Sequence, residues 1–266
     1  MARSRRPPPR AARPSPAAAP RPRRRPRRSS DPLRARLLAA ALVEFARHGF
    51  EGASTRAIAQ RARAHQPQIN YHFASKQELW KAAVDHLFAR LDAIVFDGLD
   101  GSAEPAELLA TVVRRFVRFA ARHPELNRIM VQEATAATAR VGWIVERHVR
   151  PRYEAFLALW RRVRAAGAAA PIDERVAYHA FVGAASLVYA NAPEARRLLG
   201  REPSDPELLE AHADALVAML LPGHAEARRP ESLGSTARAA RPPRRITAPP
   251  EGGVRAPATD GRRNQA

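Results

Sequence analysis

The sequence contains no cysteine, and this absence excludes several classes of protein. Without a thiol there is no disulfide framework, no Cys-ligated zinc or iron–sulfur cluster, and no thiol nucleophile. No apolar run approaches the ~18 residues that a membrane helix needs, and no apolar stretch of the kind found in a secretory signal follows the first arginines. We therefore expect a soluble, cytoplasmic protein with no membrane partner.

Lysine is almost absent, whereas arginine is abundant and concentrated at the two ends. The 266-residue chain has two lysines and a net charge of +19. Residues 1–28 hold eleven arginines, eight prolines and no acid, and residues 223–266 hold nine arginines and four acids. Such segments bury too little apolar surface to fold, which predicts a disordered Arg/Pro-rich arm and a disordered basic tail. Two interpretations stay open: a phosphate-binding arm, or compositional bias with a misplaced start codon.

Between these ends, residues 29–222 are predicted to be helical almost throughout. Their apolar residues recur at helical spacing, and no segment shows the sustained alternation of a half-buried strand. The predicted fold class is therefore all-α. We expect one domain over residues 29–90 and a second helical domain over residues 91–222.

The first domain begins with a helix and two shorter helical segments. Pro32 and Gly49 are typical of a helix start and a helix end. A second helix begins at Ser54 or Thr55, and a third covers residues 66–71. Two short helices joined by a brief turn indicate a helix-turn-helix unit.

The third helix carries one clearly apolar residue, Ile69, on an otherwise polar surface. The outward-facing residues are Gln66, Gln68, Asn70 and Tyr71. Amide side chains can pair bidentately with the adenine edge in the major groove. A merely solvated helix face is the alternative, but the helix-turn-helix arrangement at about residues 54–73 favours base recognition.

The stretch after this helix offers groups that suit a phosphate backbone. His72 and Lys76 flank Phe73, and Ser75 with Glu78 predicts a capping box at the start of the next helix. The N–H groups and dipole of such a helix start attract a phosphate. The helix that begins there is predicted to reach residue 98 and to link the two domains.

An ungapped series of residues extends through this domain. It comprises Ala39-Ala40, Phe45-Ala46, Gly49-Phe50, Ser54-Thr55, Ile58-Ala59, Ala62 and Ile69-Asn70-Tyr71-His72-Phe73-Ala74-Ser75-Lys76-Gln77-Glu78-Leu79. With this series, residues 30–90 resemble the DNA-binding domain of the tetracycline-repressor (TetR) family of bacterial transcriptional regulators. The resemblance implies a three-helix DNA-binding domain joined by a long linker helix to a helical domain for ligand binding and dimerisation.

The resemblance also implies DNA contacts at particular positions. Positions that contact phosphate or the groove edge correspond to Thr55 and Arg56. Positions that face bases correspond to Gln66, Pro67, Gln68 and Asn70. Positions that hold the sugar–phosphate backbone correspond to Tyr71, His72 and Lys76.

Two residues depart from the family's pattern in the turn before the third helix. Arg63 stands where the family usually has glycine, and His65 where it often has serine or a similar cap. A non-glycine residue in a left-handed conformation costs about 1 kcal/mol. The turn is therefore expected to be strained or rebuilt.

In the second domain, two helices are apolar on more than one side. They span about residues 176–189 and 208–220. They are either simply core or, as the resemblance implies, half of a four-helix homodimer interface. A kink is expected at Pro151, inside a longer helix over residues 143–166.

The resemblance implies a pocket for an unknown small-molecule effector between the linker helix and the helices of residues 104–170. Candidate lining residues, although such residues are more often core or interface residues, are Glu133, Trp143, Tyr153 and Trp160. Three histidines could converge on a metal, namely His148, His179 and His212. Because core or exposed histidines are commoner than ligands, we expect no metal site, and no cofactor is indicated.

The leading interpretation is a homodimeric transcriptional repressor that binds a palindromic operator in double-stranded DNA and is released by a small molecule. It would act in the bacterial cytoplasm at the nucleoid. The alternative is a sequence-tolerant architectural protein that binds DNA through its Arg-rich ends. An enzyme is not expected, because the chain has no Gly-rich phosphate loop, G-x-S-x-G or H-E-x-x-H motif.

Overall fold

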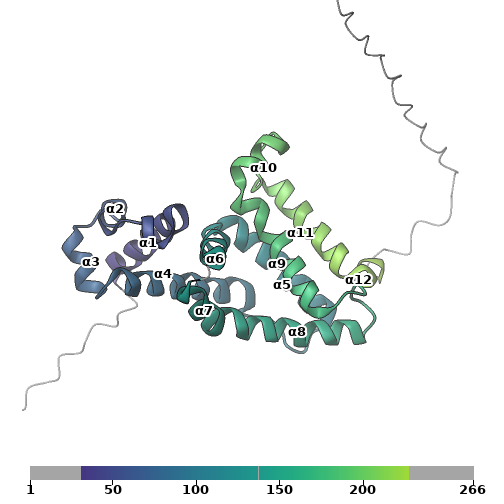
Figure 1. Ribbon diagram of the computed structural model, residues 1–266. Coiled ribbons are helices and arrows are strands. Elements are labelled where there is room, and N and C mark those ends of the chain that lie inside the picture. The colour runs from purple at the N-terminus through teal and green to yellow at the C-terminus, as the bar shows by residue number, and fades with distance from the viewer. Residues whose placement is uncertain (1–30, 137, 228–266) are drawn as a thin grey trace, which may run out of the picture. The chain divides into compact units, whose positions relative to one another are not determined.

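The computed structural model describes residues 31–136 and 138–227, and all regular structure in that part of the chain is helical (Figure 1). This confirms the predicted all-α class. The elements are α1 (Pro32–Gly52), α2 (Thr55–Arg61), α3 (Gln66–His72), α4 (Lys76–Leu91), η1 (Asp92–Phe96), α5 (Pro105–Arg122), α6 (Glu125–Thr135), α7 (Ala139–Ile144), η2 (Val145–Val149), α8 (Arg150–Ala165), α9 (Glu174–Ala190), α10 (Ala192–Leu199), α11 (Pro206–Leu220) and α12 (Pro222–Ala227). No helix in these ranges has the length and apolar character needed to cross a membrane.

The ends of the described region correct one predicted boundary. The Arg/Pro-rich arm at residues 1–28 and most of the basic tail lie outside the described residues. However, the tail was expected to begin at residue 223, and α12 continues to Ala227. Pro222 suits a first helical turn, and the preceding Leu221 is fully buried, which anchors the start of α12.

Helices α1 to α4 form the head of the protein around one apolar core. The Asp31 carboxylate accepts a hydrogen bond from the Leu33 N–H at 2.9 Å, so Asp31 caps α1 as expected. Gly49 has a φ of 68° and interrupts the helical path, after which one further turn leads to Gly52. Ser54 caps α2 and Ser75 caps α4. These local signals place each helix of the head where the sequence predicted it.

Helix α4 belongs both to the head and to the rest of the protein. Its buried stripe begins with Leu79 and Trp80 against α1 and continues to Leu91. The helical path then passes without a break into a π-helical turn, η1, that ends at Phe96. The predicted long linker helix is therefore present, with a wider last turn.

Directly before Pro151, where a kink was expected, the chain forms a second π-helical turn and the helical path continues. Residues 139–165 follow one continuous helical path, but its middle part, η2, has π-helical hydrogen bonding. Proline has no N–H to donate to the preceding turn, and its ring clashes with the carbonyl four residues earlier. A wider turn directly before Pro151 accommodates both effects.

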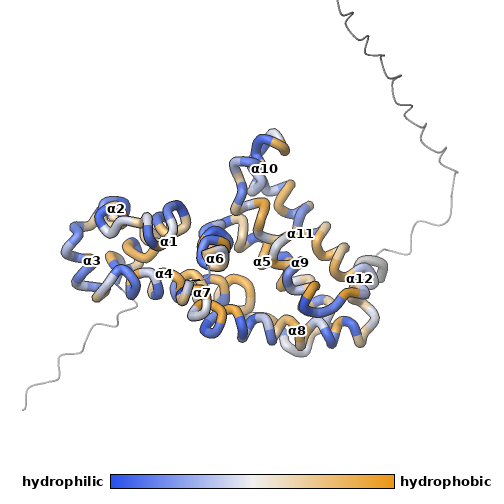
Figure 2. Tube along the Cα trace, in the orientation of Figure 1, coloured by the Kyte–Doolittle hydropathy of each residue, from blue (hydrophilic) through white to orange (hydrophobic). Residues whose placement is uncertain are grey.

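Beyond the head, α5 packs against α8, α9 and α11 around a second apolar core. Leu109, Val113 and Trp160 are among its fully buried side chains. Hydrophilic residues predominate along α2 and α3, whereas hydrophobic residues are frequent along α9 and α11 (Figure 2). The polar surface of the molecule is thus strongest on the two short helices of the head.

The turn between α2 and α3 is strained at Arg63, where the resemblance implied a glycine. Arg63 has a φ of 51° and is the one non-glycine residue with positive φ in the described ranges. The turn is closed by backbone hydrogen bonds from Arg63 N–H to Gln60 O at 3.0 Å and from Ala64 N–H to Ala59 O at 2.9 Å. The expected strain at this residue is confirmed.

We predict that Arg63→Gly stabilises the protein. A side chain in the left-handed region costs about 1 kcal/mol, part of which is offset by the greater freedom of glycine in the unfolded chain. Urea denaturation should therefore show a gain of up to about 1 kcal/mol. Arg63→Ala is the control, because it removes the guanidinium and keeps the strain; an equal gain in both variants would contradict the prediction.

Candidate nucleic-acid interface and ligand cavity

Helix α3 is held to the head by one side and exposes the other. Ile69 is 2% exposed and the following Phe73 is 5% exposed, and both belong to the apolar core that also contains Ile58 of α2. A seven-residue helix offers few other apolar contacts. Its position therefore depends on Ile69 and Phe73, and its polar residues project from the surface.

The structure brings the predicted DNA-contacting residues together on α2, α3 and the start of α4. Five are exposed, namely Arg56, Gln66, Pro67, Asn70 and Tyr71. Four are half-buried, namely Thr55, Gln68, His72 and Lys76. The ring of Tyr71 is the most conspicuous of them, since the residue is 86% exposed although it is large and aromatic.

Gln68 has a structural role that the sequence did not reveal. Its side-chain oxygen Oε1 accepts a hydrogen bond from the backbone N–H of His65 at 2.8 Å. Gln68, at the third position of α3, thus makes the capping-box contact with the N-cap residue His65. Adenine recognition needs both the oxygen and the nitrogen of an amide, so Gln68 cannot pair bidentately without releasing this cap.

Asn70 keeps both polar groups of its amide available. It is exposed, and its side chain makes no hydrogen bond with any described residue. Unlike Gln68, Asn70 can therefore offer a donor and an acceptor together.

Two of the three residues predicted to hold the sugar–phosphate backbone, His72 and Lys76, are also engaged within the head. The His72 Nε2 atom lies 3.5 Å from an oxygen of Asp31, the residue that caps α1. The Lys76 ammonium donates to the Glu51 carbonyl at 3.0 Å and lies 4.9 Å from the centre of the Phe50 ring. An ammonium has three N–H groups, so Lys76 retains donors for a phosphate.

Two polar contacts that sequence reasoning missed fix α2 against α1. The Arg61 Nε atom donates to a carboxylate oxygen of Glu44 at 2.9 Å, and Glu44 is only 6% exposed. The Arg36 Nε atom donates to the Ala62 carbonyl at 3.3 Å, at the end of α2. The only hint in the sequence is that Glu44 lies beside the buried stripe of α1.

The head is connected to α6 and α7 by polar and aromatic contacts. The Gln132 amide donates to the Ala46 carbonyl at 3.1 Å. The Arg140 guanidinium lies 4.0 Å from the centre of the Phe50 ring. The rings of Trp80 and Trp143 are 5.6 Å apart. The orientation of the head therefore depends on α6 and α7 as well as on α4.

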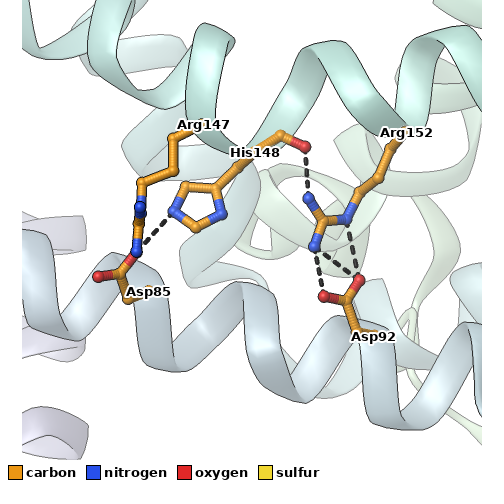
Figure 3. Close-up of polar contacts among 5 residues, drawn as sticks. All are labelled: Asp85, Asp92, Arg147, His148 and Arg152. Atoms are coloured by element: carbon orange, nitrogen blue, oxygen red, sulfur yellow. Dashed lines mark hydrogen bonds and ion pairs between the residues drawn. The ribbon is translucent and has the colours of Figure 1, made fainter.

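Further along α4, five charged or polar side chains form what we call the linker clamp: Asp85, Asp92, Arg147, His148 and Arg152 (Figure 3). Arg147 Nε and His148 Nε2 lie 2.7 and 2.9 Å from the same Asp85 oxygen. Arg152 donates from Nε and Nη2 to the Asp92 carboxylate at 3.0 and 2.5 Å, and from Nη1 to the His148 carbonyl. The clamp ties the linker helix to η2 and α8.

His148 takes part in the clamp as a neutral hydrogen-bond donor. Burial lowers the pKa of His148 below its ordinary value, more than the neighbouring Asp85 carboxylate raises it. Its ring stacks on Phe88 at 4.3 Å between centres, which leaves Nε2–H to donate to Asp85. The contact is a hydrogen bond to a carboxylate, and the ion pair with Asp85 is made by Arg147.

Next to the clamp lies a cavity of about 640 Å³. Its walls come from the linker helix, α5, α6, α7, η2, α8 and α9, and nearly all the side chains are apolar. Phe88 and Leu91 contribute the wall on the linker helix. The volume and the apolar lining are typical of a small-molecule site. The cavity lies where the resemblance implied a pocket, with α9 as an additional wall.

None of the four candidate lining residues contributes to this cavity, because each is engaged elsewhere. Glu133 is buried and paired with Arg140, and Trp143 packs on Trp80. Tyr153 contacts the Tyr178 ring edge-on, and Trp160 is fully buried in the second core. Glu133 and Trp160 are buried, whereas Trp143 and Tyr153 are half-buried and pack against the two apolar cores.

The three candidate metal-binding histidines do not converge. His148 bonds to Asp85, His212 lies 2.8 Å from the hydroxyl of Tyr189, and His179 lines the cavity. No group of three or more histidine or acidic residues suited to a metal occurs among the described residues.

Two features thus characterise the structure: an exposed polar helix in a helix-turn-helix head, and an apolar cavity beside the helix that carries this head. They define a protein with a helix-turn-helix head and a separate helical part that encloses a cavity. The family model of the bacterial regulatory proteins of the tetR family matches residues 37–83, and that of the tetracyclin repressor-like C-terminal domain matches residues 105–220. The chain belongs to the TetR family.

Two curated relatives are transcriptional repressors of the helix-turn-helix type. NicS from Pseudomonas putida is 28% identical over 104 residues, which are 39% of this chain and 49% of NicS. SCO4008 from Streptomyces coelicolor is 31% identical over 106 residues, which are 40% of this chain and 52% of SCO4008. The chain therefore spans about half the length of the curated relatives it matches.

Solved structures share the fold over most of their length. AibR, in a complex with isovaleryl coenzyme A and operator DNA, has a TM-score of 0.59 and 23% identity, and the match covers 72% of this chain and 99% of AibR. The ketosteroid regulator KstR2 of Mycobacterium tuberculosis has a TM-score of 0.57 and 20% identity, with 71% and 94% covered. At this level of identity the likeness establishes the fold.

We predict that Arg61→Met destabilises the protein by about 1–2 kcal/mol, because it leaves the buried Glu44 carboxylate without its arginine. The estimate is modest because the Arg61 side chain is 40% exposed and solvent weakens the pair. Urea denaturation provides the measurement. Arg47→Met is the matched control on exposed α1 surface, and an equal loss in both variants would show that the Glu44 pair is not the cause.

Proposed function

We propose that the protein is a homodimeric transcriptional repressor that binds a palindromic operator and is released by a small-molecule effector. It would act on the nucleoid in the bacterial cytoplasm and carry no enzymatic activity of its own. The observation that carries the proposal is the exposed polar face of α3, held in place by Ile69 and Phe73. A short helix with this surface fits the major groove, which is wide enough for an α-helix.

The side chains on this surface divide into two roles by their chemistry. Asn70 can pair with a base edge, because its amide is free. Arg56, Tyr71 and the remaining N–H groups of Lys76 suit phosphate oxygens. The start of α4, capped by Ser75, adds backbone N–H groups and the positive end of the helix dipole. Together they would read bases and fix the register on DNA.

A dimer is supported by an apolar surface that the described chain leaves uncovered. Exposed residues on α9 recur at helical spacing, namely Val176, Ala180, Gly183, Ala184 and Leu187. Met219 of α11 and Leu198 of α10 are 69% and 80% exposed. Contiguous apolar residues of this kind mark interaction sites. The sequence singled out the same two long helices, so we assign a two-fold interface to α9 and α11.

Two-fold symmetry suits the proposed operator. Two copies of α3 related by a dyad can occupy successive major grooves when they lie about 34–36 Å apart, one turn of B-DNA. A palindrome presents identical half-sites with the same symmetry. A dimer of any other spacing would engage only one half-site, which would sharply weaken binding.

Release by an effector is supported by the position of the cavity. Phe88 and Leu91, on the helix that carries the head, form part of the cavity wall. A molecule that fits better when α4 is displaced would favour a head position with the wrong spacing. The relatives NicS and SCO4008 are repressors, and AibR has been solved with both an acyl coenzyme A and operator DNA.

We predict that Asn70→Ala weakens binding to the operator by about 1–3 kcal/mol and relaxes the preference at one base pair of each half-site. Genomic DNA captured by the full chain and sequenced would supply the operator, on which binding of both proteins is then measured. Glu154→Ala is the control, because Glu154 is exposed on α8, outside the proposed DNA-contacting surface.

Either of two results would contradict this assignment. Unchanged base preference in Asn70→Ala would show that α3 does not read bases. Uniform coverage of genomic DNA by the wild-type chain would instead support a sequence-tolerant architectural protein, with a steep salt dependence.

We predict that Ala184→Arg weakens dimerisation by about tenfold or more, because it introduces an unpaired charge into the centre of an apolar interface. Sedimentation equilibrium measures the change, and loss of cooperative operator binding should accompany it. Ala158→Arg, an exposed position on α8, is the matched control. A variant at position 184 that dimerises like wild type would place the interface elsewhere.

A further inference from the structure

We infer that the cavity accepts uncharged, largely apolar molecules and excludes anionic ones, and that Asp92 sets this selectivity by neutralising the cavity's one cation, Arg152. The inference rests on the proposed effector role of the cavity and names the chemical class of its ligand. It depends on how the polar groups of the wall are already engaged.

The cavity wall contains very little polar chemistry with capacity to bind a charged group. Arg152 is the only arginine, lysine or acidic residue among the described residues that line it. The amide of Asn127 donates to the Ser186 hydroxyl at 2.5 Å, and that hydroxyl donates to the Val182 carbonyl at 2.6 Å. These polar side chains are uncharged and partly engaged with one another.

Each of the three guanidinium nitrogens of Arg152 donates to a protein group. The guanidinium donates to both oxygens of Asp92, at 2.6 and 2.5 Å from Nη2, and also to the His148 carbonyl (Figure 3). It lies 5.0 Å from the centre of the Phe88 ring. Bidentate pairing with a carboxylate is the strongest arrangement an arginine makes. The cavity therefore has a cation in its wall but no unpaired positive charge.

The titratable rings of the buried wall do not supply the missing charge. Burial lowers the pKa of His123, and the nearby Arg90 and Arg122 lower it further. Burial raises the pKa of the Tyr178 hydroxyl. At neutral pH the imidazole of His123 and the phenol of Tyr178 are both uncharged, and neither can balance an anion.

An anionic ligand would therefore face two unfavourable alternatives. Its carboxylate could enter the apolar cavity unpaired, which is costly. Otherwise it could draw Arg152 away from Asp92, which breaks a bidentate, charge-assisted pair. An uncharged ligand of the same shape neither buries an unpaired charge nor breaks the Arg152–Asp92 pair. Removing the charge of Asp92 should remove the cost of breaking that pair, since Arg152 would then be available to the ligand.

The cavity can be tested with N-phenyl-1-naphthylamine, an uncharged apolar dye whose fluorescence rises in apolar sites. The full wild-type chain should bind it, and Ala155→Trp should reduce its affinity about tenfold or more by filling space at the cavity wall. Ala158→Trp is the matched control, because Ala158 is exposed on the same helix and does not line the cavity. Equal affinity in both variants would overturn the inference.

Charge selectivity can be tested with two competitors that share one alkyl chain, decan-1-ol and decanoate. At about pH 8 the carboxylate is ionised and imidazoles are neutral. In the wild-type chain, decan-1-ol should displace the dye at a concentration about tenfold lower than decanoate or better. In Asp92→Asn the ratio of the displacing concentration of decanoate to that of decan-1-ol should fall about tenfold, because the affinity for decanoate rises while that for decan-1-ol is unchanged. Asn is close to Asp in shape, and Asp92 is exposed, so the fold should persist.

Each outcome decides a different point. Displacement by decanoate at the lower concentration in the wild-type chain would overturn the inference, and an unchanged ratio in Asp92→Asn would overturn the role of Asp92. Operator binding measured on the same samples separates the inference from the proposed function. If the wild-type chain binds the operator but not the dye, the inferred ligand class is wrong and the proposed function stands. If the wild-type chain shows no sequence-specific DNA binding, the proposed function is wrong.

Discussion

The rest of the structure depends on one helix, α4, that belongs to two environments. Its first half packs Trp80 and Val84 into the core of the head, and its second half presents Phe88 and Leu91 to the cavity. An α-helix changes its path only where a proline, a π-helical turn or an inserted side chain interrupts it. No such interruption occurs between Trp80 and Leu91. A displacement of α4 at the cavity must therefore also move the core of the head, in which α3 is held.

Contacts between the head and α6 and α7 limit how α4 can move. The Gln132 amide and the Arg140 guanidinium bind the end of α1, and Trp143 packs on Trp80. Hydrogen bonds and ring contacts of this kind weaken steeply with small changes of geometry. Packed elements therefore tend to switch between discrete arrangements and do not deform gradually. The linker clamp contains hydrogen bonds of the same kind, so it also favours discrete positions of the linker helix.

Local signals explain why the head could be predicted from its sequence. The caps of Asp31, Ser54 and Ser75, the proline of α1 and the single apolar residue Ile69 act within one helical turn, where sequence spacing and spatial neighbourhood coincide. The contact of Arg61 with Glu44 spans 17 residues and that of Arg36 with Ala62 spans 26. Such contacts depend on how helices cross, which periodicity does not encode.

The residues that line the cavity were even harder to predict from the sequence. Trp143 and Trp160 lie on one predicted helix and are large and apolar, so nothing in their sequence context separates a lining role from a core role. Packing decides: Trp160 is fully buried in the second core, and Trp143 lies against the head. The rotation of α7 and α8 instead brings Val149, Arg152 and Phe156 to the cavity. The sequence predicted which helices line the cavity, but it did not predict which face of each helix points into it.

The position of the cavity also restricts how an effector could act in the proposed dimer. One part of the wall belongs to α4, which carries the head, and another part belongs to α9, whose exposed face we assign to the partner subunit. The distance between α4 and α9 in each subunit therefore contributes to the distance between the two copies of α3. A ligand that binds equally well at every α4–α9 distance would not change operator affinity, however tight its binding. An effector must thus be matched in size to the displaced arrangement, and affinity for the cavity alone does not identify it.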